Sequence, residues 1–415
     1  MELLRVAGAT LNQTALDFAG NVARLRAVLA EARQLGVELL CLPELSITGY
    51  GCEDAFFSLS TAKAAEAALA DLLPATAGMT VVFGLPHFYY GAMYNCAVMV
   101  QDGAILGMNA KRVLPREGVH YEPRWFRPWP FGKVAETELL GQRVPLGDLR
   151  YRLGSLGVAV EVCEEAWDSV PASAAHADAV DLIVNPSASH FALGKYQKRE
   201  HLVANSSRSM QVIYLYTNLL GCEAGRIVYD GGVLFAEGGE IVARGPRFGF
   251  GDGTVVYRDV NPDLARLAKL KVKPVRDPVA DQHDSRRAAG ELPSAEIIGR
   301  DPRAGRHEEH RQALGMKRLG VGAGHAYVPL TREEEFLHAE MLGLFDYLRK
   351  SGAKGYVVPL SGGCDSSAVT VLIAHMVAEA LKELGHEAFN KRLRLNPPLV
   401  GDDVRAATHH VLTCI

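Results

Sequence analysis

The sequence predicts two α/β domains joined by a linker. Up to about residue 260, short apolar runs alternate with amphipathic segments. From about residue 268 to 326, prolines punctuate a mixed-charge stretch with few aromatic residues. At 356–382, an apolar run, a glycine turn and a helix-like segment follow one another. A chain of 415 residues is also longer than one typical core requires. The predicted boundaries are 1–265, 266–330 and 331–415.

The first domain is predicted to have a mixed α/β layer architecture. Residues 3–11 alternate like a strand, and apolar residues recur at helical spacing over 15–35 and 62–73. Hairpins are expected at Asp102-Gly103 and Gly238-Gly239, because each pair is flanked by β-prone residues. The remaining predicted strands are 37–42, 80–85, 156–162, 182–185 and 211–218.

Local sequence patterns predict the elements of the linker and of the second domain. Thr331 to Glu334 form a capping-box pattern that opens a helix ending near Leu348. A strand over 354–360, a helix over 368–382, an irregular piece over 390–401 and a helical segment over 402–415 are expected next. In the linker, the glycines of 320–324 follow no strand and predict a flexible connection. The charged run 307–310 predicts a solvated surface.

Composition narrows the class of protein. With 48% hydrophobic residues, 22% charged residues and a net charge of −4, the chain has the composition of a soluble globular protein and favours neither nucleic acid nor an anionic membrane as partner. The start lacks a signal-peptide pattern and no stretch reads as a membrane span, so we expect a cytoplasmic protein. The seven cysteines are scattered without a C-x-x-C pair, which indicates reduced thiols.

A candidate anion site lies at residues 361–367, which read Ser-Gly-Gly-Cys-Asp-Ser-Ser. A strand, a glycine turn and a helix N-terminus direct unpaired N–H groups and the helix dipole to one point. The segment has no Walker A lysine. It resembles the pyrophosphate loop (S-G-G-x-D-S) of the ATP pyrophosphatases, and that resemblance implies a need for ammonia. The residues that the loop offers to phosphate are Ser361, Gly362, Gly363, Asp365, Ser366 and Ser367.

Three residues of the first domain form a candidate amide-cleaving set. Glu44, Lys111 and Cys163 each follow a predicted strand, where functional side chains commonly lie. A thiol is weakly ionised near neutral pH, and the adjacent Glu164 and Glu165 should suppress the thiolate further. A cation and a base are therefore needed beside it, and Lys111 and Glu44 can supply them.

The first 260 residues resemble the carbon-nitrogen hydrolase (nitrilase) superfamily, whose members carry a Glu-Lys-Cys triad. The segment His120 to Phe126 resembles that family's E-x-R-x-F loop, so Glu122 corresponds to its second glutamate. The resemblance implies an αββα sandwich in which Glu44 is the general base and Cys163 the nucleophile. Lys111 and a backbone N–H near Cys163 would stabilise the oxyanion, and Glu122 would orient Lys111 or the substrate amide.

The order of the two domains resembles that of the glutamine-dependent NAD synthetases. This implies a carbon-nitrogen ligase in which glutamine supplies ammonia, through a tunnel, for ATP-dependent amidation of deamido-NAD. ATP and Mg²⁺ would act as cosubstrate and cation, with Asp365 as a candidate Mg²⁺ ligand and no tightly bound cofactor. A homo-oligomer is expected by resemblance only. Cys364 stands where the family is usually aliphatic. The resemblance places glutamine against Glu117, Ser189 and Lys195.

The second domain is predicted to be an incomplete doubly wound α/β domain, because residues 331–415 show one convincing strand. The expected activity is therefore glutamine hydrolysis without NAD synthesis. Two other hypotheses stay open: a stand-alone amidase acting on another small amide, and a non-catalytic regulatory module.

Overall fold

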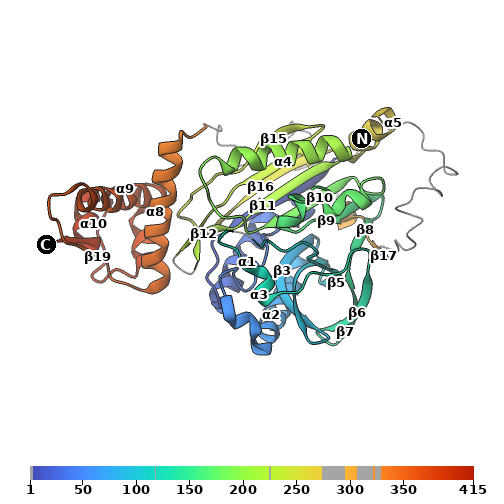
Figure 1. Ribbon diagram of the computed structural model, residues 1–415, viewed down its shortest axis with the longest axis horizontal. Helices are drawn as coiled ribbons and strands as arrows, with labels where there is room; N and C mark the ends of the chain where they lie inside the picture. Colours follow the sequence, from blue (N-terminus) through green and yellow to red (C-terminus); the bar gives the residue numbers. More distant parts are fainter. Residues whose placement is uncertain (1–2, 117, 224–225, 273–294, 306–320, 323–328) are drawn as a thin grey trace.

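Two stacked β-sheets with helices on their outer faces form the larger part of the molecule (Figure 1). The computed structural model describes residues 3–116, 118–223, 226–272, 295–305, 321–322 and 329–415. Within these residues the two sheets have nine and seven strands. This arrangement confirms the αββα sandwich that the resemblance implied.

The nine-stranded sheet is mixed. β1 pairs in parallel with β2, and β2 with β3, while β16 and β4 run antiparallel to their neighbours β1 and β3. In spatial order the strands are β18 (Val321–Gly322), β16 (Gly253–Val260), β1 (Leu4–Leu11), β2 (Leu39–Cys41), β3 (Thr80–Tyr89), β4 (Ala92–Gln101), β5 (Ala104–Ala110), β7 (Gln142–Gly147) and β6 (Val134–Leu139).

The seven-stranded sheet has parallel strands at its centre, where β9, β10 and β11 lie side by side. Its spatial order is β15 (Glu240–Arg244), β14 (Val233–Glu237), β11 (Ile213–Asn218), β10 (Leu182–Ser187), β9 (Leu156–Val160), β8 (Leu149–Leu153) and β17 (Ala295–Gly299). A separate hairpin joins β12 (Leu220–Glu223) and β13 (Ile227–Asp230).

Both faces of each sheet are buried, so apolar residues occupy successive strand positions. In β3, Val82 faces the second sheet, while Val81 and Phe83 pack beneath the helices. In β11, Leu215 faces the first sheet and Tyr214 the opposite layer. Successive side chains of a strand point to opposite faces, so one continuous apolar run supplies two cores.

Helices cover the two outer faces. α1 (Phe18–Gln34) begins at Asp17, whose carboxylate accepts from Gly20 N at 3.0 Å, and α2 (Leu59–Leu72) begins at Ser58. Both pack on the first sheet, and α4 (Lys195–Met210) packs on the second. The shorter helices are η1 (Glu53–Phe57), η2 (Leu73–Thr76), α3 (Glu122–Trp125), η3 (Cys163–Ala166), η4 (Ala172–His176) and η6 (Pro302–Gly305).

Parts of the predicted linker belong to the sandwich. α5 (Pro262–Val272) continues past residue 265, β17 extends the second sheet beside β8, and β18 pairs with β16. The pairing of β18 differs from the flexible connection predicted at 320–324, of which only residues 321 and 322 are described. The charged run 307–310 lies outside the described residues.

The second part of the chain is a small α/β unit. It consists of α8 (Arg332–Ser351), β19 (Tyr356–Val358), α9 (Cys364–Leu393), α10 (Val404–Val411) and β20 (Leu412–Cys414). Thr331 and Glu334 form the predicted capping box of α8. The helical prediction for 402–415 was wrong at its end, because residues 412–414 pair in parallel with β19. The helical pattern of α10 gave no sign of this long-range pairing.

Helix α9 corrects a second prediction. An 18-residue window of this helix has mean hydropathy 1.3, so by length and composition it could cross a membrane, which the sequence reading did not notice. In the structure, α9 is interrupted at Gly385, and its buried residues Ile373, Met376 and Val377 belong to the core that α8 shares. In the structure 28% of this window is buried, and a single helix of this kind is weak evidence for a membrane span.

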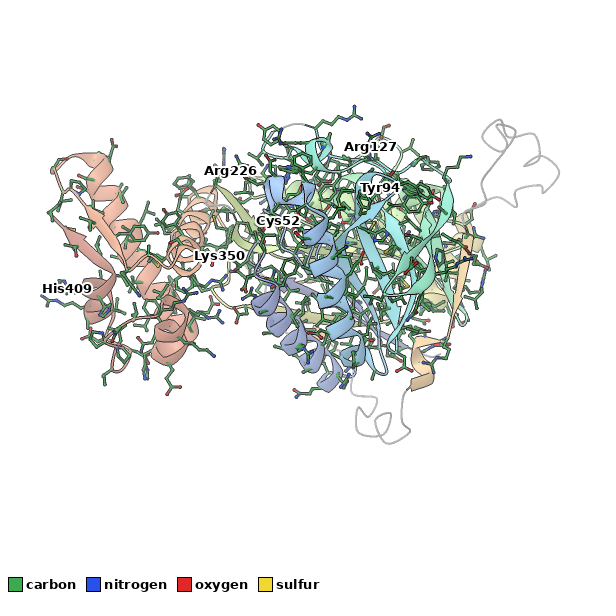
Figure 2. The ribbon with its side chains drawn as sticks, turned by 90° about the horizontal axis from the view of Figure 1, so that it is seen from below. Cys52, Tyr94, Arg127, Arg226, Lys350 and His409 are labelled. Atoms are coloured by element: carbon green, nitrogen blue, oxygen red, sulfur yellow. The ribbon has the colours of Figure 1, made fainter. Side chains whose placement is uncertain are left out.

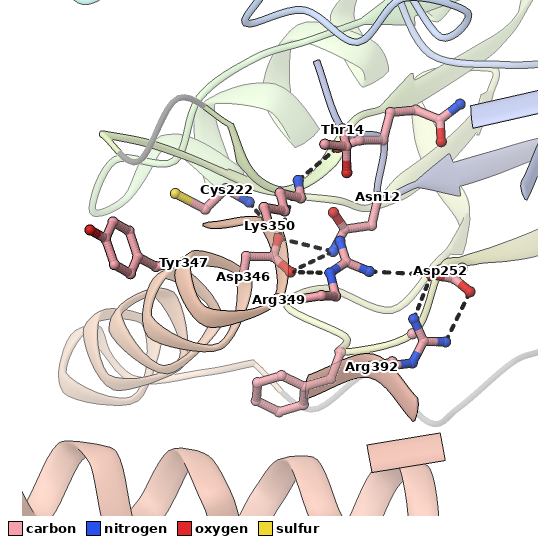
Figure 3. Close-up of polar contacts among 12 residues, drawn as sticks. Asn12, Thr14, Cys222, Asp252, Asp346, Tyr347, Arg349, Lys350 and Arg392 are labelled. Carbon is pink, nitrogen blue, oxygen red and sulfur yellow. Dashed lines mark hydrogen bonds and ion pairs between the residues drawn. The ribbon is translucent and has the colours of Figure 1, made fainter. Parts of the chain in front are cut away.

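A buried polar junction connects α8 to the sandwich (Figure 3). Asp346 accepts from Asn12 Nδ2 at 3.0 Å and from Cys222 N at 2.7 Å, and it lies 3.1 Å from Arg349 Nε. Lys350 donates to the backbone oxygen of residue 13 at 2.7 Å. Figure 2 shows Lys350 at this boundary and His409 on the opposite side of the small unit.

Candidate active site

Strands from both sheets bring three predicted residues to one place. Glu44 follows β2, Lys111 directly follows β5, and Cys163 follows β9 at the start of η3. The Lys111 backbone is fixed by its N–H, which donates to Asn95 O at 2.9 Å. The site therefore lies at strand ends, where each side chain has a rigid base.

Lys111 lies between two carboxylates. Its Nζ is 2.6 Å from Glu44 Oε1 and 2.7 Å from Glu122 Oε1, and all three side chains are at most 1% exposed. Burial acts to lower the pKa of Lys111, but Glu122 and Glu44 raise it above its ordinary value. The ammonium is retained, so the side chain can stabilise a developing negative charge.

Glu44 is held by more than the lysine. Asn95 Nδ2 donates to its Oε1 at 2.7 Å, and Ala188 N donates to its Oε2 at 3.0 Å. Strand β3 passes directly behind it: a Cβ on Gly84 would lie 2.2 Å from the backbone nitrogen of Leu45. Glycine at residue 84 is thus what lets β3 approach the segment that carries the carboxylate.

Cys163 is a buried thiol on a left-handed backbone, with φ +48°. Burial raises the pKa of the thiol, Glu44 and Glu122 raise it further, and Lys111 acts in the opposite direction. The prediction that Glu164 and Glu165 suppress the thiolate needs correction. The carboxylates with the largest influence on the thiol are Glu44 and Glu122, whereas Glu165 pairs with Arg112.

Glu165 ties the segment of Lys111 to the segment of Cys163. One oxygen accepts from the backbone N–H of Arg112 at 2.6 Å, and the other accepts from that of Val162 at 2.7 Å. Arg112 and Val162 are the neighbours of Lys111 and Cys163. Arg112 Nε also lies 3.2 Å from Glu165 and compensates its charge. Glu165 therefore fixes the separation of the two strand ends.

The predicted glutamine contacts lie along the segment after β10. Ser189 is buried; its N–H donates to Asn218 Oδ1 at 2.8 Å, and its carbonyl accepts from Arg199 Nη2 at 2.9 Å. Lys195 begins α4, and burial and Arg199 lower its pKa to about 8, while Cys163 acts to raise it. Glu117 lies outside the described residues.

The predicted phosphate loop has the expected strand-loop-helix geometry. β19 ends at Val358, Gly362 has φ +79°, and Gly363 precedes the first residue of α9. Ser367 Oγ donates to Gly363 O at 2.8 Å. Most of the loop is exposed, including Asp365 and Cys364, so Cys364 does not fill the apolar position that its replacement of an aliphatic residue suggested.

Comparison with known proteins places the first part of the chain. Residues 5–270 match the family model "Carbon-nitrogen hydrolase". The chain belongs to the carbon-nitrogen hydrolase family. Residues 336–390 match a second model, "NAD synthase".

Several curated proteins and solved structures are similar over most of this chain. The glutamine-dependent NAD(+) synthetases of Arabidopsis thaliana and Saccharomyces cerevisiae are each 31% identical to it, over 92% and 94% of its length and 52% and 55% of theirs. The crystal structure of a glutamine-dependent NAD(+) synthetase from Cytophaga hutchinsonii aligns with TM-score 0.78 and 33% identity, covering 100% of this chain and 60% of that one. The chain thus spans about half the length of the curated relatives that it matches.

The candidate site of this carbon-nitrogen hydrolase also contains residues that were not predicted from the sequence. Asn95 and the Ala188 N–H hold Glu44, and Tyr50 donates to Glu122 Oε1 at 2.6 Å. Asn95 lies within β4, and no local sequence pattern marks it as a functional residue. Tyr50 lies six residues after Glu44, and a phenol hydroxyl so close in sequence to a candidate base was the available clue.

Proposed function

We propose that this chain hydrolyses the carboxamide of glutamine at Cys163 and releases ammonia, as the glutaminase part of a glutamine-dependent NAD synthetase. The observation that carries the proposal is the buried ammonium of Lys111 between Glu44 and Glu122 at strand ends that also present Cys163. The names of the relatives supply the substrate, since they are glutamine-dependent NAD(+) synthetases.

The residues act in a defined order. Glu44 takes the thiol proton as Cys163 attacks the carboxamide carbon, and Lys111 stabilises the negative charge that develops on the oxygen. Glu44 returns the proton to the nitrogen, the C–N bond breaks, and ammonia leaves a thioester. Water activated by Glu44 then attacks the thioester, which releases glutamate and restores the thiol.

For the second part of the chain, we propose that residues 361–367 bind the phosphates of ATP. Its helix N-terminus and backbone N–H groups suit an anion. Mg²⁺ would be held mainly by those phosphates with Asp365 beside them, because Mg²⁺ commonly uses one or two carboxylates together with substrate oxygens. The described residues contain no cluster of three or more His, Cys, Asp or Glu that could hold a metal. Ammonia from the first site would amidate deamido-NAD.

The test of the glutaminase proposal is a panel of amides. We expect kcat/KM for ammonia release to be highest with glutamine among glutamine, asparagine, acetamide and nicotinamide. Cys163→Ala should lower the glutamine rate by roughly 10⁴ or more, because the nucleophile is lost. Cys414→Ala, which removes an exposed thiol far along the chain, is the matched control.

Other outcomes would identify a different function. A higher kcat/KM for another small amide would indicate a stand-alone amidase. No ammonia release from any amide would indicate a regulatory module. ATP-dependent conversion of deamido-NAD to NAD, tested with the same preparation, would show that the loop at 361–367 also works in this chain.

A further inference from the structure

A continuous line of polar side chains leads from Glu122 to the half-exposed start of α4. The Tyr50 hydroxyl is 2.6 Å from Glu122 Oε1 and 3.0 Å from His120 Nδ1. His120 Nε2 is 2.8 Å from His190 Nδ1, and Lys195 Nζ lies beside the His190 ring, 3.2 Å from Nδ1 and 3.4 Å from Nε2. These residues come from three separate segments of the chain, so the line is a product of the fold.

When Glu122 is ionised, the number of available protons makes every hydrogen bond of the line point toward Glu122. The single Tyr50 proton is donated to Glu122, so the Tyr50 oxygen must accept from His120 Nδ1–H. A neutral imidazole has one N–H, so His120 Nε2 accepts from His190 Nδ1–H. The Lys195 ammonium lies close to both His190 nitrogens, and Nε2 is then the one that can accept from it. Burial lowers the pKa of His120 to about 3 and that of His190 to about 4, so both rings are neutral at pH 7.

If Glu122 carries a proton, every donor in the line can reverse. Glu122 then donates to Tyr50, and each following residue donates one step farther, ending at a neutral Lys195. Burial raises the pKa of Glu122 and lowers the pKa of Lys195 to about 8. The pKa values at the two ends of the line are therefore closer than in free side chains. The charged or titratable groups that act on Lys195 and His190 are Arg199, Cys163, Asp230 and Glu164.

Glu122 Oε1 contacts both neighbours in the proposed line. Lys111 Nζ is 2.7 Å from this oxygen, and the Tyr50 hydroxyl is 2.6 Å from it. Oε2 has no hydrogen-bond partner in the described part of the chain. A proton that Lys111 gives to Oε1 therefore lies beside Tyr50 and can pass to it.

The proposed reaction creates a need for a proton exit. Forming the thioester from glutamine and the thiol releases NH₃ with no net proton. Hydrolysis of the thioester gives a carboxylic acid, which becomes glutamate carboxylate and one proton. If ammonia leaves neutral, as a nucleophile must, this proton remains in a site whose Glu44, Lys111 and Glu122 side chains are buried.

We propose that Tyr50, His120, His190 and Lys195 carry this proton from Glu122 to solvent during thioester hydrolysis. The inference rests on the proposed glutaminase function. Lys111 contacts both carboxylates, so it can take the proton from Glu44 as it gives one to Glu122. The proton then passes along the line to neutral Lys195, which releases it to water.

The test separates the two half-reactions. In rapid-mixing experiments with glutamine, His120→Gln and His190→Gln should leave the first burst of ammonia unchanged, because thioester formation exports no proton. Steady-state turnover should fall by at least about tenfold, with the acyl group accumulating on Cys163 in intact-protein mass spectra. Added imidazole should restore turnover in a concentration-dependent way, since it can accept the proton. His201→Gln, on the exposed face of α4, is the control.

Two results would overturn the inference. Unchanged steady-state turnover in both variants would show that the proton leaves by another route. An equally slowed burst that imidazole does not restore would show that the histidines only hold the structure. Failure of the proposed function is distinguishable, because the unmodified chain would then release no ammonia from glutamine.

Discussion

At the scale of single residues, the site is organised by charge. One ammonium lies between two buried carboxylates, so Cys163 faces a net negative surrounding and its thiol is held in the protonated form. In the proposed mechanism, the thiolate therefore forms as Glu44 takes the proton during attack. This separates Cys163 from cysteines that are reactive because their pKa is lowered.

Replacing Glu44 should change thiol reactivity and turnover in opposite directions. Glu44→Gln removes a negative charge that raises the pKa of Cys163, so the thiolate should form at lower pH. Iodoacetamide alkylation of Cys163, followed by peptide mass spectrometry across pH, should shift toward lower pH than in the unmodified chain.

The same variant loses the proposed general base, so ammonia release should fall by roughly 10² or more. Exposed Cys364 in the same sample reports on the reagent itself. An alkylation profile that moves to higher pH would contradict the assigned influence of Glu44 on the thiol.

Residue types at strand ends singled out Glu44, Lys111 and Cys163, and the resemblance of residues 120–126 to the family's E-x-R-x-F loop added Glu122. Their supports were not predictable, since Asn95 and Glu165 act through backbone and side-chain groups that are distant in sequence. From the sequence, Glu165 was expected to suppress the thiolate of Cys163, because the two residues are close along the chain. The sequence does not show that Arg112 compensates the charge of Glu165.

At the scale of helices and strands, most predicted elements of the sandwich are present, with ends that differ by a few residues. Helix α4 was missed because its buried face contains Arg199, Ser206 and Ser207, which weaken the apolar periodicity. Strands β17 and β20 were missed because they are short and gain their hydrogen bonds from distant strands.

The docking of α8 depends on Asp346. Burial acts to raise its pKa, but Arg349 and Lys350 hold the pKa below the ordinary value. We expect Asp346→Asn to destabilise α8 by about 3 kcal/mol, because it leaves those cations without their buried partner. Amide hydrogen exchange of α8 should then be roughly a hundredfold faster at pH 7.

The pH dependence of this effect has a defined sign. A carboxyl with a lowered pKa in the folded state contributes stability above its unfolded pKa and loses it as the pH falls through the folded value. The difference between the two proteins should therefore shrink below about pH 4. Glu379→Gln, in an exposed pair with Lys382, should change little. Equal exchange rates at pH 7 would show that Asp346 does not hold α8.

At the scale of the whole molecule, the site exists because two sheets are stacked. Glu44 and Lys111 come from one sheet and Cys163 from the other, and no local pattern states that these strand ends meet. The family resemblance supplied that information. The same stacking aligns His120 and His190, which no sequence pattern connected to the triad.

The most direct test of the account is covalent trapping with a chloroketone analogue of glutamine. We expect one adduct per chain, located on Cys163 by peptide mass spectrometry, blocked by glutamine and absent in Cys163→Ala. The exposed thiols Cys364 and Cys414 should stay unmodified at the same reagent concentration. Labelling of those thiols with Cys163 intact, in a chain that releases no ammonia from glutamine, would contradict the assignment of this site.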